Sequence, residues 1–269
     1  MCSKGNWESE TSIIMGKDII TEDNYFDSEF QEQYMSVSQF KSFMKCPAQT
    51  MAQLRGEFET GSKDAFLEGH FVEESLFGDI EDFKSKHIEL YAYKKVENGL
   101  KANFKKLENV INTALGDELF MSYLDGEHQV VRTGEIAGVP FKIMMDIYHK
   151  DRIVDLKAMA NIKNGYFIDD YRYDIQGAVY QAIEGNNKPF YIAALSKEAV
   201  PDKIIIQIDQ EILDNCLETV KYYAPKFQAI KDGILLPDRC EECDYCKSTK
   251  KLTNVVKLKE LYEREKGEY

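Results

Sequence analysis

Two apolar segments separated by a short charged turn constrain most strongly what this chain can fold into. They are IMMDIY (143–148) and RIVDLKAM (152–159), and each has the composition of a buried β-strand. The first contains Asp146, and the second contains Asp155 and Lys157. A buried ionised group costs several kcal/mol unless it is paired or binds a metal. The two segments therefore predict neighbouring strands whose charged residues compensate one another or hold an ion.

Side chains alternate along a strand, and this alternation places two of the charged residues on one face. Asp155 and Lys157 point the same way, about 7 Å apart along the backbone. If the HKDR turn folds the preceding strand back, Asp146 lies close to Asp155. Two converging carboxylates repel unless a cation lies between them, and Mg²⁺ or Mn²⁺ suits such oxygen ligands. A bound divalent cation lowers the pKa of a water, which the lysine orients or helps to deprotonate, as phosphodiester hydrolysis requires.

The acid-x-Lys pattern is common in a chain with 30% charged residues, so it needs a control. Asp82-Phe-Lys84 also matches, but it lies in a polar, helical segment without an acidic strand before it. Only the copy at 146–157 combines two apolar strands, a turn and an upstream carboxylate. The alternative for this copy is an ordinary surface ion pair between Asp155 and Lys157 at a strand edge.

The rest of the chain changes from helical to strand periodicity and back. Residues 1–34 are polar and acidic and predict a flexible N-terminal arm. We expect helices over 36–56 (interrupted by Pro47), 62–79 and onward to about 118, then 168–185, 210–233 and 250–269. We expect strands over 128–138, 139–150, 152–160, 189–198 and 202–210. This order predicts one α/β domain with a mixed β-sheet core, flanking helices and an N-terminal helical part.

Composition and charge limit the partners. No stretch reaches the ~20 apolar residues of a membrane helix, and residues 1–12 lack the apolar run of a secretory signal, so we expect a cytoplasmic protein that is not in a membrane. The net charge of -13 argues against broad adhesion to nucleic acid. It leaves room for a DNA enzyme with a local basic channel, for which the candidates are Lys41, Lys45, Arg55, Arg132, Lys142 and Arg172.

The aspartate on one strand followed by Asp-Leu-Lys on the next resembles the PD-(D/E)XK nucleases. Three further segments are similar to the RecB and lambda-exonuclease branch of that superfamily: SVSQFKSFMKCP (36–47), GHFVE (69–73) and RYDIQGAVYQA (172–182). The likeness covers about residues 34–250 and is greatest to RecE-like prophage exonucleases. It implies a restriction-endonuclease-like mixed β-sheet core in a nuclease domain over 35–250. The residues that follow, 251–269, are expected from their own composition to form a charged C-terminal helix.

The resemblance also implies roles for the residues of the two strands. Asp146 and Asp155 become metal ligands, with the carbonyl of Leu156 as a further ligand. Lys157 becomes the catalytic lysine. The implied cofactor is Mg²⁺ or Mn²⁺.

Two helices carry the remaining implied site residues. Glu73 lies where the branch often has histidine, which makes it an acidic ligand or a residue that positions water. His70 falls outside the motif and is interpreted as an ordinary helix-surface residue. Gln176 and Tyr180 lie one turn apart on the helix after the lysine strand, which in the family contacts DNA or supports the lysine. A core role for Tyr180 is equally consistent.

The activity implied by the resemblance is a metal-dependent exonuclease that hydrolyses phosphodiester bonds at double-stranded DNA ends in phage-type recombination or repair. A single-strand annealing recombinase and further copies of the chain are the implied partners. One alternative is an inactive member of the fold that serves as a DNA-binding or scaffold protein. The other is an interaction protein, built around an iron–sulfur or zinc centre, with no catalysis.

Four of the six cysteines form a set. They are Cys46, Cys240, Cys243 and Cys246. Four thiolates suffice for one zinc ion or one iron–sulfur cluster, and the C-x-x-C-x-x-C run is closer to the ferredoxin type than to paired zinc knuckles. Iron–sulfur nucleases of the superfamily have a similar arrangement of one early and three late cysteines. We therefore expect a [4Fe–4S] cluster that joins the N-terminal helices to the chain's end, with zinc and free thiols as alternatives. Cys2 and Cys216 are interpreted as incidental.

Overall fold

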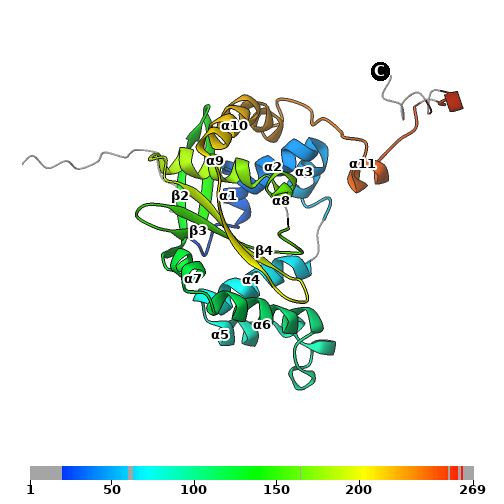
Figure 1. Cartoon of the computed structure of the whole chain (residues 1–269). Coiled ribbons are helices and arrows are strands. Elements are labelled where there is room, and N and C mark those ends of the chain that lie inside the picture. Colours follow the sequence, from blue (N-terminus) through cyan, green and yellow to red (C-terminus); the bar gives the residue numbers. More distant parts are fainter. Residues whose placement is uncertain (1–19, 60–62, 164, 254, 260–261, 263–269) are drawn as a thin grey trace, which may run out of the picture.

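A mixed β-sheet lies at the centre of the structure, and helices cover both of its faces (Figure 1). The computed structural model describes residues 20–59, 63–163, 165–253, 255–259 and 262. The strands run in the order β1-β3-β4-β5-β6, with β2 also paired to β3. Their bounds are β1 Met35–Ser36, β2 Glu127–Ile136, β3 Val139–Tyr148, β4 Ile153–Met159, β5 Phe190–Ser196 and β6 Lys203–Gln207. The pairs β4–β5 and β1–β3 are parallel and the others antiparallel, which confirms the predicted mixed sheet.

Strand β3 has three neighbours, and this branching shapes the site. β2 pairs along its whole length after a tight turn in which Ala137 and Gly138 both have positive φ, the geometry of a type I′ hairpin. The opposite edge of β3 is shared. β1 pairs there with residues 141–142, and β4 pairs only with residues 147–148. Between these two contacts β3 and β4 separate, so residues 143–146 face a gap in the sheet.

The helices on one face come from both ends of the chain. They are α2 Val37–Lys45, α3 Pro47–Leu54, α9 Tyr173–Glu184 and α10 Gln210–Lys231. The Ser36 side chain caps α2 by accepting a hydrogen bond from the Gln39 backbone, and Pro47 begins α3 at the interruption that the sequence predicted. The rings of Phe40 and Phe43 in α2 pack against Phe227 in α10, with centroids 5.3 Å apart in both pairs. These contacts fix the N-terminal helices on the core of the domain.

A second layer of helices covers the opposite face. It contains α4 Lys63–Phe77, α5 Ile80–Lys86, α6 Ala102–Leu115 and α7 Glu118–Leu124, with three short 3₁₀ turns between residues 88 and 98. Leu107 and Phe71 of this layer pack with Leu156 and Leu195 of the sheet in one apolar cluster. In Figure 1 the cyan-to-green layer lies below the sheet. Within the described residues, none of the helices has the length and apolar character that a membrane span needs.

Part of the segment expected to be a flexible arm is folded. Residues 28–33 form helix α1 (Ser28–Gln33), in which Phe30 is buried, and Tyr25 before it is buried as well. The Tyr25 hydroxyl donates to the Lys142 carbonyl, and the Lys142 ammonium donates to the Tyr25 carbonyl. Reciprocal bonds to β3 therefore hold the segment against the sheet. Residues 1–19 of the expected arm lie outside the described residues.

The helix expected over 168–185 is divided in two. Helix α8 (Tyr166–Tyr171) ends at Arg172, which has left-handed backbone angles (φ 53°), and α9 begins at the next residue. The Arg172 guanidinium pairs with the Asp174 carboxylate at 3.1 Å, which stabilises this conformation. The break redirects the chain so that α9 packs on the sheet, and Gly185 (φ 82°) ends α9 as expected.

The end of the chain matches the expected charged helix only in part. Helix α11 (Asp244–Ser248) contains Cys246, the last cysteine of the run, and residues 251–253 and 255–257 are not helical. Leu258, Lys259 and Tyr262 are helical. Much of 257–269 lies outside the described residues.

Candidate active site

The charged residues of β3 and β4 come together where the two strands separate. The last paired residues are Ile147 with Val154, and one step further along the same register Asp146 lies opposite Asp155. The Lys157 ammonium lies 2.7 Å from Asp155 Oδ2 and 3.4 Å from Asp146 Oδ2. One cation therefore contacts both carboxylates, so the structure brings together the three residues singled out in the sequence.

Backbone groups of β4 complete this arrangement. The Leu156 N–H donates to Asp146 Oδ2 at 3.0 Å, in place of the strand pairing that has been lost there. The Leu156 carbonyl accepts a hydrogen bond from the Lys157 ammonium at 3.1 Å. The carbonyl that the family resemblance assigns to the metal thus lies beside the two carboxylates.

Burial and mutual charge perturb the site. Asp155 is fully buried, and burial, with repulsion from Asp146, raises the pKa of its carboxyl to about 7. Burial alone would lower the pKa of Lys157, but the charges of Asp146 and Asp155 outweigh it and raise the pKa above its usual value. Lys157 therefore keeps its proton at neutral pH. Its ammonium is the charge that makes two adjacent carboxylates tolerable.

Helix α9 fixes Asp155 from the other side. Gln176 Nε2 donates to Asp155 Oδ1 at 2.6 Å and also lies 3.1 Å from the Tyr180 hydroxyl. That hydroxyl donates to the Met144 carbonyl at 2.7 Å, within the unpaired part of β3. Gln176 and Tyr180 thus bridge the gap in the sheet, and Gln176 orients the Asp155 carboxylate, whereas the resemblance implied contact with DNA or support of the lysine. The role of the Met144 carbonyl as a hydrogen-bond acceptor could not be predicted, because a backbone carbonyl is common to every residue type.

A glycine brings α9 close enough to make these bonds. A Cβ built on Gly177 would lie 2.4 Å from Cδ1 of Phe190 in β5, well inside normal contact. Any larger residue would push the helix away from the sheet. Gly69 of the GHFVE segment is different, since no atom lies within 4 Å of a Cβ built there.

Glu73 lies near the two aspartates but forms no compact ligand set with them. It lines a cavity of about 670 Å³ together with His70, Met144 and Asp146. Burial raises the pKa of Glu73 to about 8, and the charge of Asp146 adds to the shift. Among the described residues, the four cysteines are the one group of three or more His, Cys, Asp or Glu side chains whose ligand atoms all lie within 4.8 Å of one another. Glu73 is therefore better placed to hold a water in the cavity than to share one ion directly with both aspartates.

The donor set fits a divalent cation. Asp155 Oδ2 is buried, and the Lys157 ammonium lies 2.7 Å from it, the place where a cation is favoured. Asp146 and the Leu156 carbonyl supply further oxygens beside it. Hard oxygen donors of this kind suit Mg²⁺ or Mn²⁺.

Not all of the basic residues expected to line a DNA channel are placed to contact DNA. Lys142 is fully buried beneath Tyr25 and cannot contact DNA, so its assignment is wrong. The Arg172 guanidinium forms an ion pair with the Asp174 carboxylate. Lys41 does lie at the site, where its ammonium is 3.1 Å from the Tyr171 carbonyl and 3.4 Å from Gln176 Oε1.

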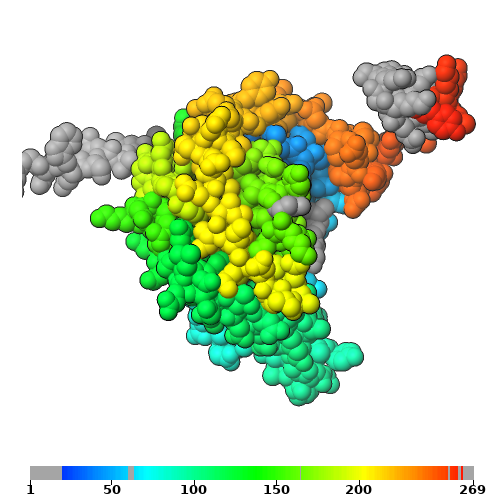
Figure 2. Space-filling view, in the orientation of Figure 1, coloured from blue at the N-terminus to red at the C-terminus, as the bar shows by residue number. Residues whose placement is uncertain are grey.

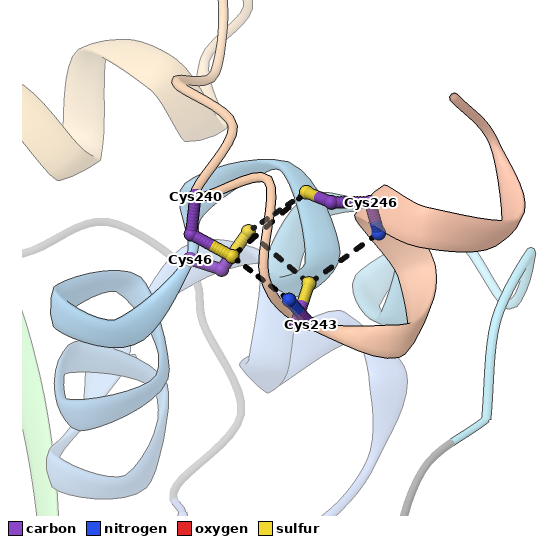
Figure 3. Close-up of side chains that lie close together, drawn as sticks. All are labelled: Cys46, Cys240, Cys243 and Cys246. Atoms are coloured by element: carbon purple, nitrogen blue, oxygen red, sulfur yellow. Dashed lines mark hydrogen bonds between the residues drawn. The ribbon is translucent and has the colours of Figure 1, made fainter. Parts of the chain in front are cut away.

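The four cysteines form a second cluster, away from the carboxylates. Cys46 lies between α2 and α3, and Cys240, Cys243 and Cys246 come from the chain's end. Figure 3 shows all four sulfurs pointing toward one another. Cys46 and Cys246 are buried, and none of the five described cysteines is in a disulfide. Cys216 lies apart from this cluster, and its thiol donates to Asp174.

The fold and this site define a member of the PD-(D/E)XK nuclease superfamily, and comparisons with known proteins agree. Residues 36–249 match the family model of a PDDEXK-like domain of unknown function (DUF3799). The chain therefore belongs to that family. None of the curated proteins matches it.

A solved structure extends the likeness. It is the crystal structure of a protein from Eubacterium rectale described as a "Putative exonuclease". The two chains share 35% identity with a TM-score of 0.82, covering 91% of this chain and 98% of that one. A second structure, of SSO0001, has 14% identity and a TM-score of 0.32 over 73% of this chain and 99% of that one, too low to carry an argument. The family and this neighbour identify the chain as a nuclease, for which DNA is the substrate implied by the fold.

Proposed function

We propose that this nuclease is a Mg²⁺- or Mn²⁺-dependent deoxyribonuclease that hydrolyses phosphodiester bonds at the ends of double-stranded DNA. The observation that carries the proposal is the contact of one lysine ammonium with two carboxylates at a gap between strands, at 2.7 and 3.4 Å. The exonuclease description of the similar structure from Eubacterium rectale supports action at ends. A role in phage-type recombination or repair, beside an annealing recombinase, belongs to the same proposal.

Asp146, Asp155 and the Leu156 carbonyl would hold the cation. When bound, the divalent ion supplies positive charge that acidifies a water and offsets the charge of the scissile phosphate. Lys157 then exchanges its carboxylate contacts for the phosphate, and its ammonium donates a hydrogen bond to an oxygen that gains negative charge in the reaction. Gln176 holds Asp155 in place throughout. Glu73 faces the cavity and accepts a hydrogen bond from water there.

The alternative is a catalytically inactive domain that binds DNA or serves as a scaffold. Asp146, Asp155 and Lys157 are all present, and the lysine ammonium contacts both carboxylates. This complete set favours the active enzyme.

End-labelled linear DNA and a covalently closed circle of the same sequence test the proposal, each incubated with and without Mg²⁺. We expect Mg²⁺-dependent release of label from the linear DNA and an intact circle. Lys157→Ala should be inactive, and Lys163→Ala should retain activity, since Lys163 is 77% exposed and pairs with Glu198. Cleavage of the circle would contradict the end requirement. Linear DNA left intact with Mg²⁺ or Mn²⁺, but bound, would favour the inactive domain.

A further inference from the structure

The four cysteine sulfurs lie too close together for an iron–sulfur cluster. Cys46 Sγ is 3.6 Å from Cys246 Sγ and 3.7 Å from Cys243 Sγ, and Cys240 Sγ is 3.9 Å from Cys246 Sγ. All four lie within 4.8 Å of one another. We propose that these cysteines bind a single zinc ion, in place of the [4Fe–4S] cluster that the sequence led us to expect. The proposal does not depend on the nuclease activity.

A tetrahedral zinc site has a characteristic spacing of ligand atoms. With Zn–S bonds of about 2.3 Å, the sulfurs at the corners of a tetrahedron are about 3.8 Å apart. Three of the Sγ–Sγ separations, 3.6 to 3.9 Å, agree with this edge. The cysteine sulfurs therefore already have the spacing that one four-coordinate ion requires.

The clusters with more than one iron need a wider cage. In a [4Fe–4S] cube each cysteine thiolate binds a different iron at an outer corner, so the cysteine sulfurs are separated by roughly 6 Å. A [2Fe–2S] cluster would divide the cysteines into two distant pairs. Neither is compatible with four sulfurs that are all within 4.8 Å of each other.

Backbone groups around the sulfurs prepare them to be thiolates. The N–H groups of Gln49, Cys243 and Cys246 donate to the sulfurs of Cys46, Cys240 and Cys243, at 3.3 to 3.4 Å. Such N–H···S bonds spread the negative charge of a four-thiolate site. With four protein ligands and two of the cysteines buried, the site is closed, as in structural zinc centres.

The ion would join the start of the domain to its end. Cys46 is the residue between α2 and α3, and the Ala48 N–H donates to the Asp238 carbonyl at 3.0 Å beside the cluster. Figure 2 shows the orange C-terminal segment against the blue N-terminal helices. Helix α2 also carries Lys41, which contacts Gln176 at the nuclease site. The zinc ion therefore stabilises the layer that forms one wall of that site.

Metal and sulfide analysis of the full chain tests the proposal. Cells are supplied with both iron and zinc, and the protein is purified once in air and once without oxygen. We expect one zinc ion per chain in both preparations, no acid-labile sulfide and a colourless protein. Iron in the anaerobic protein, with or without sulfide, would overturn the proposal. So would a metal-free protein in which all the cysteines react with a thiol reagent.

Substitutions and metal exchange sharpen the test. Cys240→His should keep the zinc ion, since Cys₃His is a common structural set, whereas Cys240→Ala should lose it. Cys216→Ser, which alters a buried thiol outside the cluster, should keep one zinc per chain. If Cys240→Ala is insoluble, Co²⁺ exchange into the unaltered chain decides. Intense visible bands of tetrahedral, thiolate-bound Co²⁺ support the proposal, and weak octahedral bands contradict it.

Discussion

The Lys157 ammonium lies 2.7 Å from Asp155 Oδ2, an oxygen that is buried. The same ammonium reaches Asp146, so it holds the position between two carboxylates that a divalent cation also favours. Under the proposed function, lysine and cation would provide the same charge compensation at different stages. The metal-free protein would use the lysine, and a bound cation would free it for the substrate.

Removal of this ammonium should have two separable effects. Lys157→Ala is expected to lower Mg²⁺-dependent cleavage by about 100-fold or more, because a group that stabilises developing charge is lost. It should also lower the free energy of unfolding of the metal-free protein by about 3 kcal/mol, because two close carboxylates lose their partner. Urea unfolding with and without Mg²⁺ measures the second effect, and Mg²⁺ should restore much of the stability. Equal losses with and without the ion would contradict the shared role.

The ligand assignment is tested at Asp155. Asp155→Asn keeps the shape of the side chain and the hydrogen bond donated by Gln176 but removes the negative charge. Loss of groups that merely support metal ligands weakens binding about 10- to 100-fold, so loss of a charged ligand should weaken Mn²⁺ binding at least as much. Titration calorimetry with Mn²⁺ gives the affinity. Asp151→Asn, at a side chain 73% exposed and paired with Arg152, is the matched control. Unchanged affinity in Asp155→Asn would remove this residue from the site.

The two helical glycines should respond in opposite directions. Gly177→Ala places a methyl group against Phe190 and should destabilise the protein by about 1–3 kcal/mol through overpacking. It should also reduce activity, because α9 carries Gln176. Gly69→Ala meets no neighbouring atom and should stabilise α4 by about 0.5–1 kcal/mol. Urea unfolding of both variants measures the difference, and equal effects would show that α9 does not pack closely on β5.

The buried lysine beneath the N-terminal segment should make stability depend on pH. Burial lowers the pKa of Lys142 to about 8, below its ordinary value of 10.5. Between these values the unfolded chain binds more protons than the folded one, so stability should rise as the pH increases from 8 toward 10. Lys142→Met lacks this group and should show a smaller rise. Unfolding free energies at pH 8, 9 and 10 test the difference, and parallel curves would contradict the assignment.

Much of the sheet and part of the site follow from the sequence, for identifiable reasons. Strands β2 to β6 were predicted because their apolar alternation is long, and Asp155 and Lys157 because strand periodicity fixes their shared face. Strand β1 is two residues long, too short for any period to be seen. The helix break at Arg172 depends on a left-handed backbone conformation, which an arginine in the sequence does not predict.

Long-range geometry accounts for the remaining differences. The count and spacing of the cysteines predicted a metal centre, but only the sulfur separations distinguish one ion from a cluster. Lys142 has the charge of a DNA-binding residue, and only its position under Tyr25 shows that DNA cannot reach it.

Cys46 and Cys246 lie 3.6 Å apart although 200 positions of sequence separate them. During synthesis the first thiol therefore leaves the ribosome long before its three partners exist. The centre can assemble only once translation has passed residue 246, after the strands that bear the carboxylates have emerged. A product interrupted before residue 246 would lack this closure, so the centre requires every strand and helix between its first and last thiol to have been synthesised.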